Sequence, residues 1–261
     1  MKKTPIPSLP REIPDAWRSR LAGAPLFDSS SSPEARVIYA EYDGGVYCKL
    51  APAGTLAQEA QMTEYFHGKG LAPAVLDYRT GARDLLVTRA AEGEDATHPD
   101  YLSDPARLAA VMGKGLRALH DSDASGCPVP RRMDGYFALV EANYQRGMFD
   151  PSYLSSHAHF ATAAEAYAVY QNGKDALKND TLIHGDYCLP NIMLRNFRIS
   201  AFVDVGNGGV GDRHVDLFWG AWTLVYNLKT EKYCDRFLDA YGRERVEREL
   251  LFTVAAAECF G

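Results

Sequence analysis

Two acidic residues and one amide residue in the second half of the chain have the types and spacing needed to handle phosphate. Asp186 and Asn191 stand in the segment H-G-D-x-x-x-x-N, Asp204 opens the segment D-V-G, and each segment follows a short apolar run. Phosphoryl transfer needs Mg²⁺ to neutralise phosphate oxygens and a residue that orients the attacking hydroxyl. Carboxylate and amide oxygens are the hard ligands that Mg²⁺ prefers. The three residues therefore predict a site for phosphoryl transfer.

The order of acid, amide and acid is also the order found in protein kinases, where H-R-D-x-x-x-x-N precedes D-F-G. Taken one at a time, Asp186 and Asn191 could be turn residues, and Asp204 could be the end of a strand. Together, in this order, the three favour the functional interpretation. His184 is interpreted as a hydrogen-bonded residue that supports the loop.

The stretch 183–217 closely resembles the aminoglycoside 3′-phosphotransferases, the kanamycin and neomycin kinases. Their block reads approximately H-G-D-x-C-L-P-N-I, then F-I-D-x-G-x-x-G-V-x-D-R-x-x-D. The matching residues here are His184-Gly185-Asp186, Cys188-Leu189-Pro190-Asn191-Ile192, Asp204, Gly206, Gly209-Val210, Asp212-Arg213 and Asp216. Weaker likeness extends over nearly the whole chain. The resemblance implies an α+β, two-lobed protein-kinase-like fold in which Asp186 is the catalytic base and Asn191 and Asp204 hold Mg²⁺.

The pattern of the first 90 residues is that of a small β-rich unit with one helix. A β-hairpin is predicted from Arg36 to Leu50, because strand formers flank the turn dipeptide Asp43-Gly44. A capping box at Thr55–Gln58 predicts a helix that continues to about Gly68. Two further short strands are expected at 75–77 and 85–88.

The pattern then changes to helix. Pro105–His120 carries apolar residues at helical spacing, and Thr162–Leu177 is a second helical stretch. Short strands are expected at Thr181–Ile183 and Ile199–Val205. We therefore predict a nucleotide-binding lobe at 1–90, a hinge near 88–92, and a helical lobe at 93–261 that carries the catalytic loop and the substrate site.

Lys49 and Glu59 are the residues of the first lobe that the resemblance singles out. Lys49 lies on the second strand of the predicted hairpin, and Glu59 lies in the helix that follows. A lysine on a strand can be no more than an exposed edge charge. The resemblance implies instead that Lys49 contacts the ATP phosphates and that Glu59 positions it.

The rest of the nucleotide site is also implied by the resemblance. Ser29, Ser30 and Ser31 occupy the place of the phosphate-covering loop, without the G-x-G-x-x-G of protein kinases. The backbone of Thr88 and Ala90 is expected to hydrogen-bond the adenine. The expected cofactors are ATP and Mg²⁺, and GTP stays open as the phosphate donor.

The acceptor site departs from the family pattern. Aminoglycosides are polycations, so their site needs carboxylates. The family's upstream acidic pair is replaced by Ser155 and Ser156, its frequent arginine by Asn207, and only Glu258 remains of its terminal acidic pair. Asp150 could compensate. We expect an aminoglycoside acceptor with weak or narrow activity, or as the alternative another hydroxylated metabolite.

Three other classes of function stay open on the sequence alone. Gly206–Gly211 matches G-x-G-x-x-G, which suggests a dinucleotide-binding oxidoreductase, although the residues that follow look helical. His184, Asp186, Asp204 and His214 could be ligands of a metallohydrolase, although such sites draw on more histidine. A nucleotide-binding module without catalysis is the third.

Composition excludes several partners and indicates a compartment. The formal net charge of −6 disfavours nucleic-acid binding, because duplex binding depends on Lys and Arg. No apolar run is long enough for a membrane span, and prolines interrupt the only segment that could be a signal peptide. The five cysteines form no C-x-x-C pair. We therefore expect a cytoplasmic enzyme with nucleotide and small-molecule partners, and neither nucleic-acid nor membrane partners.

Overall fold

A six-stranded antiparallel sheet occupies the amino-terminal part of the structure, which is a computed structural model describing residues 3–154 and 160–261. Its strand order is β1-β2-β3-β4-β6-β5. The strands are β1 (Thr4–Pro5), β2 (Leu26–Asp28), β3 (Arg36–Ala40), β4 (Val46–Pro52), β5 (Val75–Arg79) and β6 (Arg83–Arg89). The predicted hairpin is confirmed as β3 and β4. Lys49 on β4 lies opposite Val37 on β3 and Leu86 on β6, so it stands in the middle of the sheet.

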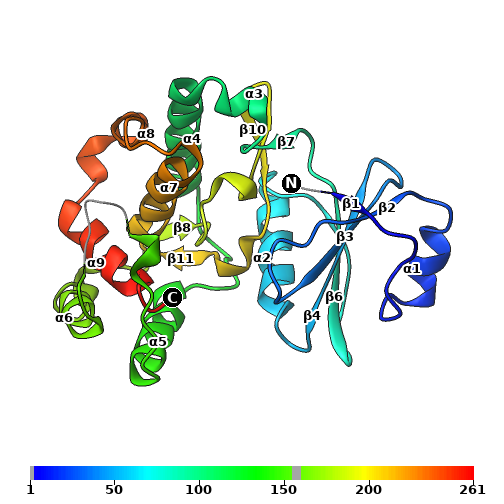
Figure 1. The fold of residues 1–261 in the computed structure, drawn as a ribbon, viewed down its shortest axis with the longest axis horizontal. Coiled ribbons are helices and arrows are strands. Elements are labelled where there is room, and N and C mark those ends of the chain that lie inside the picture. Colours follow the sequence, from blue (N-terminus) through cyan, green and yellow to red (C-terminus); the bar gives the residue numbers. More distant parts are fainter. Residues whose placement is uncertain (1–2, 155–159) are drawn as a thin grey trace.

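Two helices pack with this sheet. Helix α1 (Asp15–Arg20) buries Trp17 against the sheet core, and α2 (Ala57–Gly68) lies between the sheet and the helical part of the molecule (Figure 1). Met62 and Phe66 of α2 are fully buried, because they fall on one face of the helix. The long helix α2 therefore has contacts with both parts of the fold.

The predicted capping box of α2 is wrong. The side chain of the N-cap residue Leu56 makes no capping hydrogen bond, and the hydroxyl of Thr55 donates to the carbonyl of Pro52 instead. The carboxylate of Asp84, on β6, accepts hydrogen bonds from the amides of Gly54 and Leu56, each 2.9 Å long. A group distant in sequence therefore fixes the start of the helix that carries Glu59.

The remainder of the chain is mainly helical (Figure 1). Its helices are α3 (Pro99–Leu102), α4 (Pro105–His120), α5 (Arg132–Gln145), α6 (Ala163–Gly173), α7 (Arg213–Leu228), α8 (Cys234–Tyr241) and α9 (Arg248–Glu258). The predicted helix Pro105–His120 is confirmed at both ends, and Leu108, Met112 and Leu116 of α4 are fully buried. The second predicted helix is shorter, because α6 ends at Gly173 and a 3₁₀ turn (Lys174–Ala176) follows.

Two small sheets carry the segments with the chemically important residues. Strands β10 (Arg198–Phe202), β9 (Ile192–Arg195) and β7 (Glu94–Asp95) form one, and β11 (Gly209–Gly211) with β8 (Thr181–Ile183) forms the other. The strand expected at Ile199–Val205 ends at Phe202. Asp204 has a positive φ of 56°, a backbone conformation that is uncommon for non-glycine residues and does not continue a strand.

The segment Gly206–Gly211 does not form a dinucleotide-binding turn. It contains part of a 3₁₀ turn (Val205–Asn207) and strand β11, which pairs antiparallel with β8 and leads into α7. All strand pairs of the described residues are antiparallel, whereas the dinucleotide-binding fold needs parallel strands. The oxidoreductase hypothesis is therefore excluded by the fold, which is the predicted α+β, two-lobed kinase-like arrangement.

The segment between the lobes is held against the helical lobe. Strand β7 pairs with β9, and the amide of Ala96 donates to the carbonyl of Ile192 at 2.9 Å. Gly93 has a φ of 93°, and a Cβ at this position would lie 2.1 Å from the carbonyl oxygen of Leu194. A glycine is therefore required at the point where the segment between the lobes passes β9.

Candidate active site

The loop between β8 and β9 holds Asp186 and Asn191 in one hydrogen-bonded unit. The side-chain amide of Asn191 donates to the carboxylate of Asp186 at 2.8 Å and to its carbonyl at 3.1 Å. The predicted supporting role of His184 is confirmed: its Nδ1 accepts from the amide of Asp186 at 3.2 Å, and its Nε2 lies 3.1 Å from the carbonyl of Val203. The buried imidazole thus connects this loop to the strand that leads to Asp204.

Helix α7 also holds this loop in place, through the side chain of Asp216. The fully buried carboxylate of Asp216 accepts hydrogen bonds from the amides of His184 and Gly185, each 2.7 Å long. Gly185 has a φ of 81°, and a Cβ there would lie 1.9 Å from the carbonyl oxygen of Asn207. The loop can therefore adopt this path only with glycine beside the aspartate.

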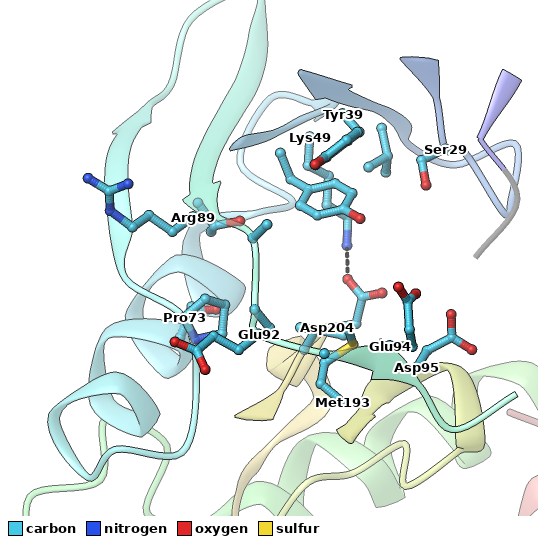
Figure 2. A pocket seen from close by; sticks show the side chains of 18 of the residues that line it. Ser29, Tyr39, Lys49, Pro73, Arg89, Glu92, Glu94, Asp95, Met193 and Asp204 are labelled. Atoms are coloured by element: carbon cyan, nitrogen blue, oxygen red, sulfur yellow. Dashed lines mark hydrogen bonds and ion pairs between the residues drawn. The ribbon is translucent and has the colours of Figure 1, made fainter. Parts of the chain in front are cut away.

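Lys49, Glu59 and Asp204 form an ion-pair cluster between the lobes. The ammonium of Lys49 lies 2.8 and 2.9 Å from the two carboxylate oxygens of Glu59, and 2.9 Å from Oδ1 of Asp204. Figure 2 shows Lys49 extending from the sheet toward Asp204. Burial alone lowers the pKa of Lys49, but the carboxylates of Asp204 and Glu59 outweigh it and raise that pKa. The predicted pairing of Lys49 with Glu59 is confirmed, and Lys49 stays a cation.

A cavity of about 620 Å³ opens on one side of this cluster, between the six-stranded sheet and the segment 88–95 (Figure 2). Thr88 and Ala90 line it, as expected of residues near an adenine. The amide of Ala90 already donates to the carbonyl of Gly45 at 2.9 Å. A nucleobase in this cavity would therefore have to form its hydrogen bonds with the carbonyl of Ala90 or with the peptide groups that follow it.

The three serines of the predicted phosphate loop have different surroundings. Ser29 and Ser31 line the cavity, and within the described residues the buried Oγ of Ser29 has no hydrogen-bond partner. A buried hydroxyl without a partner is costly, so this one is suited to a ligand. The hydroxyl of Ser30 accepts a hydrogen bond from the amide of Val37 on β3 at 2.9 Å, so this serine is tied to the sheet.

A second cavity, of about 810 Å³, opens on the other side of the cluster. Lys49, Glu59 and Asp204 line both cavities, whereas Asp186 and Asn191 line only the second. Asn207 lines it too, as predicted for an acceptor residue. The two cavities therefore meet at the ion-pair cluster, with Asp186 on the side away from Thr88.

Two other predicted acceptor residues, Glu258 and Asp150, do not line this cavity. Glu258 is buried, and its Oε1 accepts hydrogen bonds from the hydroxyl of Tyr136 at 2.9 Å and from Nε1 of Trp219 at 3.2 Å. Burial raises the pKa of Glu258 to about 7. Asp150 is exposed and caps a 3₁₀ turn (Pro151–Tyr153) through the amide of Ser152. Ser155 and Ser156 lie outside the described residues.

Some residues that position the site or line it were not among the predicted site residues. Trp219 and Trp222 of α7 line the second cavity, and Gln58 of α2 donates to the carbonyl of Gly206 across the lobes at 2.7 Å. Thr223 is buried and its hydroxyl accepts from the amide of Leu189 in the catalytic loop. The aromatic spacing of α7 was visible in the sequence, but the contacts between segments were not.

The side-chain oxygens of Asn191 and Asp204 are suitable ligands for Mg²⁺, whereas the nearby histidines are not arranged as ligands of a metal ion. Asn191 and Asp204 offer amide and carboxylate oxygens on adjoining segments, since the amide of Val203 donates to the carbonyl of Asn191 at 3.0 Å. Both histidines of the metallohydrolase hypothesis are used by the protein: His184 as described, and His214 by Asp212 and the amide of Glu247. Among the described residues, no group of three His, Cys, Asp or Glu side chains is arranged to hold a metal. The hydrogen bonds of His184 and His214 within the protein therefore argue against the metallohydrolase hypothesis.

Comparison with known proteins identifies the family. The model of the phosphotransferase enzyme family matches residues 30–251. The chain belongs to the phosphotransferase enzyme family. This phosphotransferase is 41% identical over 251 residues to a probable aminoglycoside 3′-phosphotransferase of Lactococcus lactis, covering 96% of this chain and 95% of the relative. It is 31% identical to an aminoglycoside 3′-phosphotransferase of Streptomyces fradiae, covering 79% and 82% of the two chains.

Solved structures agree on the fold. An aminoglycoside 3′-phosphotransferase of type VIII superposes on this phosphotransferase with a TM-score of 0.77 at 24% identity, covering 95% of this chain and 97% of the other. An aminoglycoside phosphotransferase of Streptomyces rimosus, solved in complex with ADP and streptomycin, superposes with a TM-score of 0.68 at 24% identity, covering 85% and 90%. The enzyme thus has the fold of these kinases. Within its described residues, no helix combines the length and the apolar character needed to cross a membrane.

Proposed function

We propose that this phosphotransferase moves the γ-phosphoryl group of ATP to a hydroxyl of an aminoglycoside-like small molecule. The observation that carries the proposal is the meeting of two cavities at Lys49 and Asp204. One is lined by the sheet and the interlobe segment, and the other by Asp186. A nucleotide in the first cavity and an acceptor in the second would face each other across the ion-pair cluster.

The nucleotide is proposed to lie with its base near Thr88 and Ala90 and its phosphates near Lys49. This divides the chain into a nucleotide-binding lobe at 1–90, a hinge near 88–92 and a substrate lobe at 93–261. Within the described residues the buried hydroxyl of Ser29 has no hydrogen-bond partner, which supports the proposal that a polar ligand lies next to it. ATP is the proposed donor, because relatives of this fold have been solved with ADP or with AMP-PNP.

Asp186 is proposed to orient the acceptor. Its carboxylate accepts a hydrogen bond from the acceptor hydroxyl and takes its proton as transfer proceeds. The hydroxyl oxygen forms the new bond to phosphorus, the bond between the γ-phosphorus and the bridging oxygen breaks, and ADP leaves. The amide of Asn191 holds the carboxylate in place at 2.8 Å.

Asn191 and Asp204 are the proposed ligands of Mg²⁺, which neutralises phosphate charge when it is bound. The ammonium of Lys49 is held by Glu59 in position for the α- and β-phosphates. Asp204 bonds to Lys49 through Oδ1, and its side chain is 47% exposed, so the carboxylate is accessible from the cavities. The ammonium of Lys49 therefore also holds Asp204, one of the two proposed Mg²⁺ ligands, in position.

The acceptor is proposed to be of the aminoglycoside 3′-phosphotransferase type, with weak or narrow activity. The curated relatives named for that reaction support the class of acceptor. The expectation of a weak or narrow range of aminoglycoside acceptors rests on the carboxylates that are not available to bind ammonium groups. Glu258 is buried, and Asp150 caps a 3₁₀ turn. The enzyme is further proposed to act in the cytoplasm, which fits its five free cysteines.

The test is Mg²⁺-dependent ADP release over a panel of kanamycin, neomycin and neutral cyclic alcohols. The wild-type enzyme should release ADP with at least one acceptor, and Asp204→Ala should abolish this release because it removes a metal ligand and the partner of Lys49. Asp134→Ala, an exposed aspartate on α5, is the control. Unchanged turnover in Asp204→Ala would refute the assignment of the site.

A further inference from the structure

A short turn at residues 205–208 forms part of the second cavity. Gly206 and Asn207 of this turn line the cavity, and side chains from both lobes bind their carbonyls. Gln58 of α2 donates to the carbonyl of Gly206 at 2.7 Å. From the other lobe, Nε of Arg132 on α5 donates to the carbonyl of Asn207, also at 2.7 Å. The turn is therefore held from two sides.

The carbonyl of Asn207 also packs against the catalytic loop. A Cβ on Gly185, the residue before Asp186, would lie 1.9 Å from the oxygen of this carbonyl. The loop and the turn therefore approach each other more closely than a residue with a side chain at position 185 would allow. Arg132 binds the oxygen at this contact, and so holds the turn beside the loop that carries Asp186.

Arg132 also sets the orientation of the Asn207 side chain. Its Nη2 donates to Oδ1 of Asn207 at 3.4 Å, so the guanidinium binds two oxygens of the same residue. Because Oδ1 points to the guanidinium, the Nδ2 group, a donor of two hydrogen bonds, is left for a ligand. Within the described residues Nδ2 has no hydrogen-bond partner, and Asn207 is exposed to the cavity.

The charge of Arg132 has a second effect. Burial lowers the pKa of this guanidinium, and the carboxylate of Glu258 opposes the shift. In return, Arg132 lowers the pKa of Glu258, which burial raises. Arg132 therefore acts on Asn207 by geometry and on Glu258 by charge, and substitutions have to separate the two.

We propose that Arg132 is a positioning residue that directs the side-chain amide of Asn207 to the acceptor. Nδ2 of Asn207 then donates to a hydroxyl or ether oxygen of a sugar or cyclitol ring, while another hydroxyl of the same molecule faces Asp186. This inference rests on the proposed function, because it assumes that the second cavity holds the acceptor. It adds a specific donor to the acceptor site.

The experiment is a double-mutant cycle of Arg132→Gln and Asn207→Ala in ADP-release assays. The acceptor is the one with the highest kcat/KM among kanamycin, neomycin and neutral cyclic alcohols. Arg131→Gln is the matched control, because this neighbouring arginine is 71% exposed and pairs with Asp134. The KM for ATP and the thermal shift with Mg·ATP report on the nucleotide site and on folding in each variant.

Asn207→Ala should raise the KM of the acceptor about two- to tenfold while kcat changes less than about threefold, because one neutral hydrogen bond contributes a factor of this size. Arg132→Gln should raise this KM by a similar factor. The double variant should have the KM of Asn207→Ala, because Arg132 acts through that side chain. The KM for ATP should stay within about twofold of wild type in all variants.

Arg132→Lys separates geometry from charge. It keeps a positive charge near Glu258, but an ammonium does not reproduce the two contacts of the planar guanidinium. The KM of the acceptor should therefore rise about as much as in Arg132→Gln. If Arg132→Gln is unstable, Arg132→Lys completes the same cycle with Asn207→Ala.

Three results would overturn the role of Arg132 and leave the kinase assignment intact. The first is a double variant whose increase in acceptor KM is the product of the two single increases. The second is a wild-type acceptor KM in Asn207→Ala or in Arg132→Lys. The third is a KM for ATP that rises in parallel with that of the acceptor. Absence of ADP release from wild type with every acceptor would instead refute the proposed function, and this inference with it.

Discussion

At the scale of single residues, Lys49 is the residue on which most of the site depends. It contacts Glu59 and Asp204 with distances of 2.8–2.9 Å and lines both cavities. The side chain of Glu59 is only 13% exposed, so its charge depends on this partner. The family resemblance implied the pair of Lys49 with Glu59, but the contact with Asp204 required the fold.

Substitutions at Lys49 should affect the free energy of unfolding and the rate of phosphoryl transfer for different reasons, which can be told apart. Lys49→Met leaves the buried carboxylate of Glu59 without its ammonium partner and should cost about 3 kcal/mol in the free energy of unfolding. The double variant Lys49→Met/Glu59→Gln should recover most of that stability and none of the phosphoryl transfer. Urea unfolding and ADP release measure the two effects.

Lys114→Met, an exposed lysine of α4, is the control for this pair of variants. It should match wild type in both measurements. Full activity in the double variant would show that Lys49 serves only to neutralise Glu59.

Glu258 should make stability depend on pH. Its folded-state pKa of about 7 lies above the ordinary value of 4.5, because of burial, so the folded protein holds this proton more tightly than the unfolded chain. Stability is therefore lost as pH rises from 4.5 to about 7. Glu258→Gln should remove this loss and gain up to about 3 kcal/mol relative to wild type near pH 8, but little near pH 4.5.

The measurement is urea unfolding of both proteins across this pH range. Glu249→Gln, an exposed residue of the same helix, should leave the pH dependence of wild type unchanged. Parallel stability curves for wild type and Glu258→Gln would contradict the raised pKa of this carboxyl.

At the scale of elements, α7 does the most to place the catalytic loop. Asp216 in its first turn binds two loop amides and contacts His120 of α4 at 3.1 Å. Asp216→Asn replaces one acceptor oxygen with a donor, which should lower kcat at least about tenfold and stability by about 1–3 kcal/mol. ADP-release kinetics and urea unfolding are the measurements.

Asp239→Asn on α8 is the matched control, because that aspartate is 65% exposed and, in the part of the chain that the structure describes, forms an ion pair with Arg243 one turn away. It should change stability by less than about 0.5 kcal/mol. A normal kcat in Asp216→Asn would show that the loop keeps its shape without α7.

The sequence predicted the elements whose signals are local. The hairpin of β3 and β4 carries its own turn dipeptide, and the apolar spacing of α4 is continuous, so both were confirmed. The start of α2 was explained wrongly, because the amides of Gly54 and Leu56, just before the helix, are bound by Asp84 on β6. Helix α5 was not predicted, although its buried residues Met133, Tyr136, Val140 and Asn143 fall at helical spacing.

At the scale of the whole molecule, the function depends on how the two lobes face each other. Gln58 of α2 reaches the carbonyl of Gly206, and the amide of Phe202 donates to the carbonyl of Leu71 at 2.7 Å. These contacts hold α2, which carries Glu59, against the segment that carries Asp204. Order and spacing in the sequence predicted Asp186, Asn191 and Asp204 as one set of residues, whereas the contacts that join the two lobes depend on packing that no local pattern specifies.

The most direct test of the phosphoryl-transfer mechanism is phosphorus NMR of the acceptor after incubation with Mg·ATP and wild-type or Asp186→Asn enzyme. Wild type should form a phosphate monoester on an acceptor hydroxyl. Asp186→Asn should form it at least about a hundredfold more slowly, because the hydroxyl loses the carboxylate that orients it and takes its proton. The same variant should still show the thermal shift with Mg·ATP. Equal rates of ester formation in the two proteins would contradict the account.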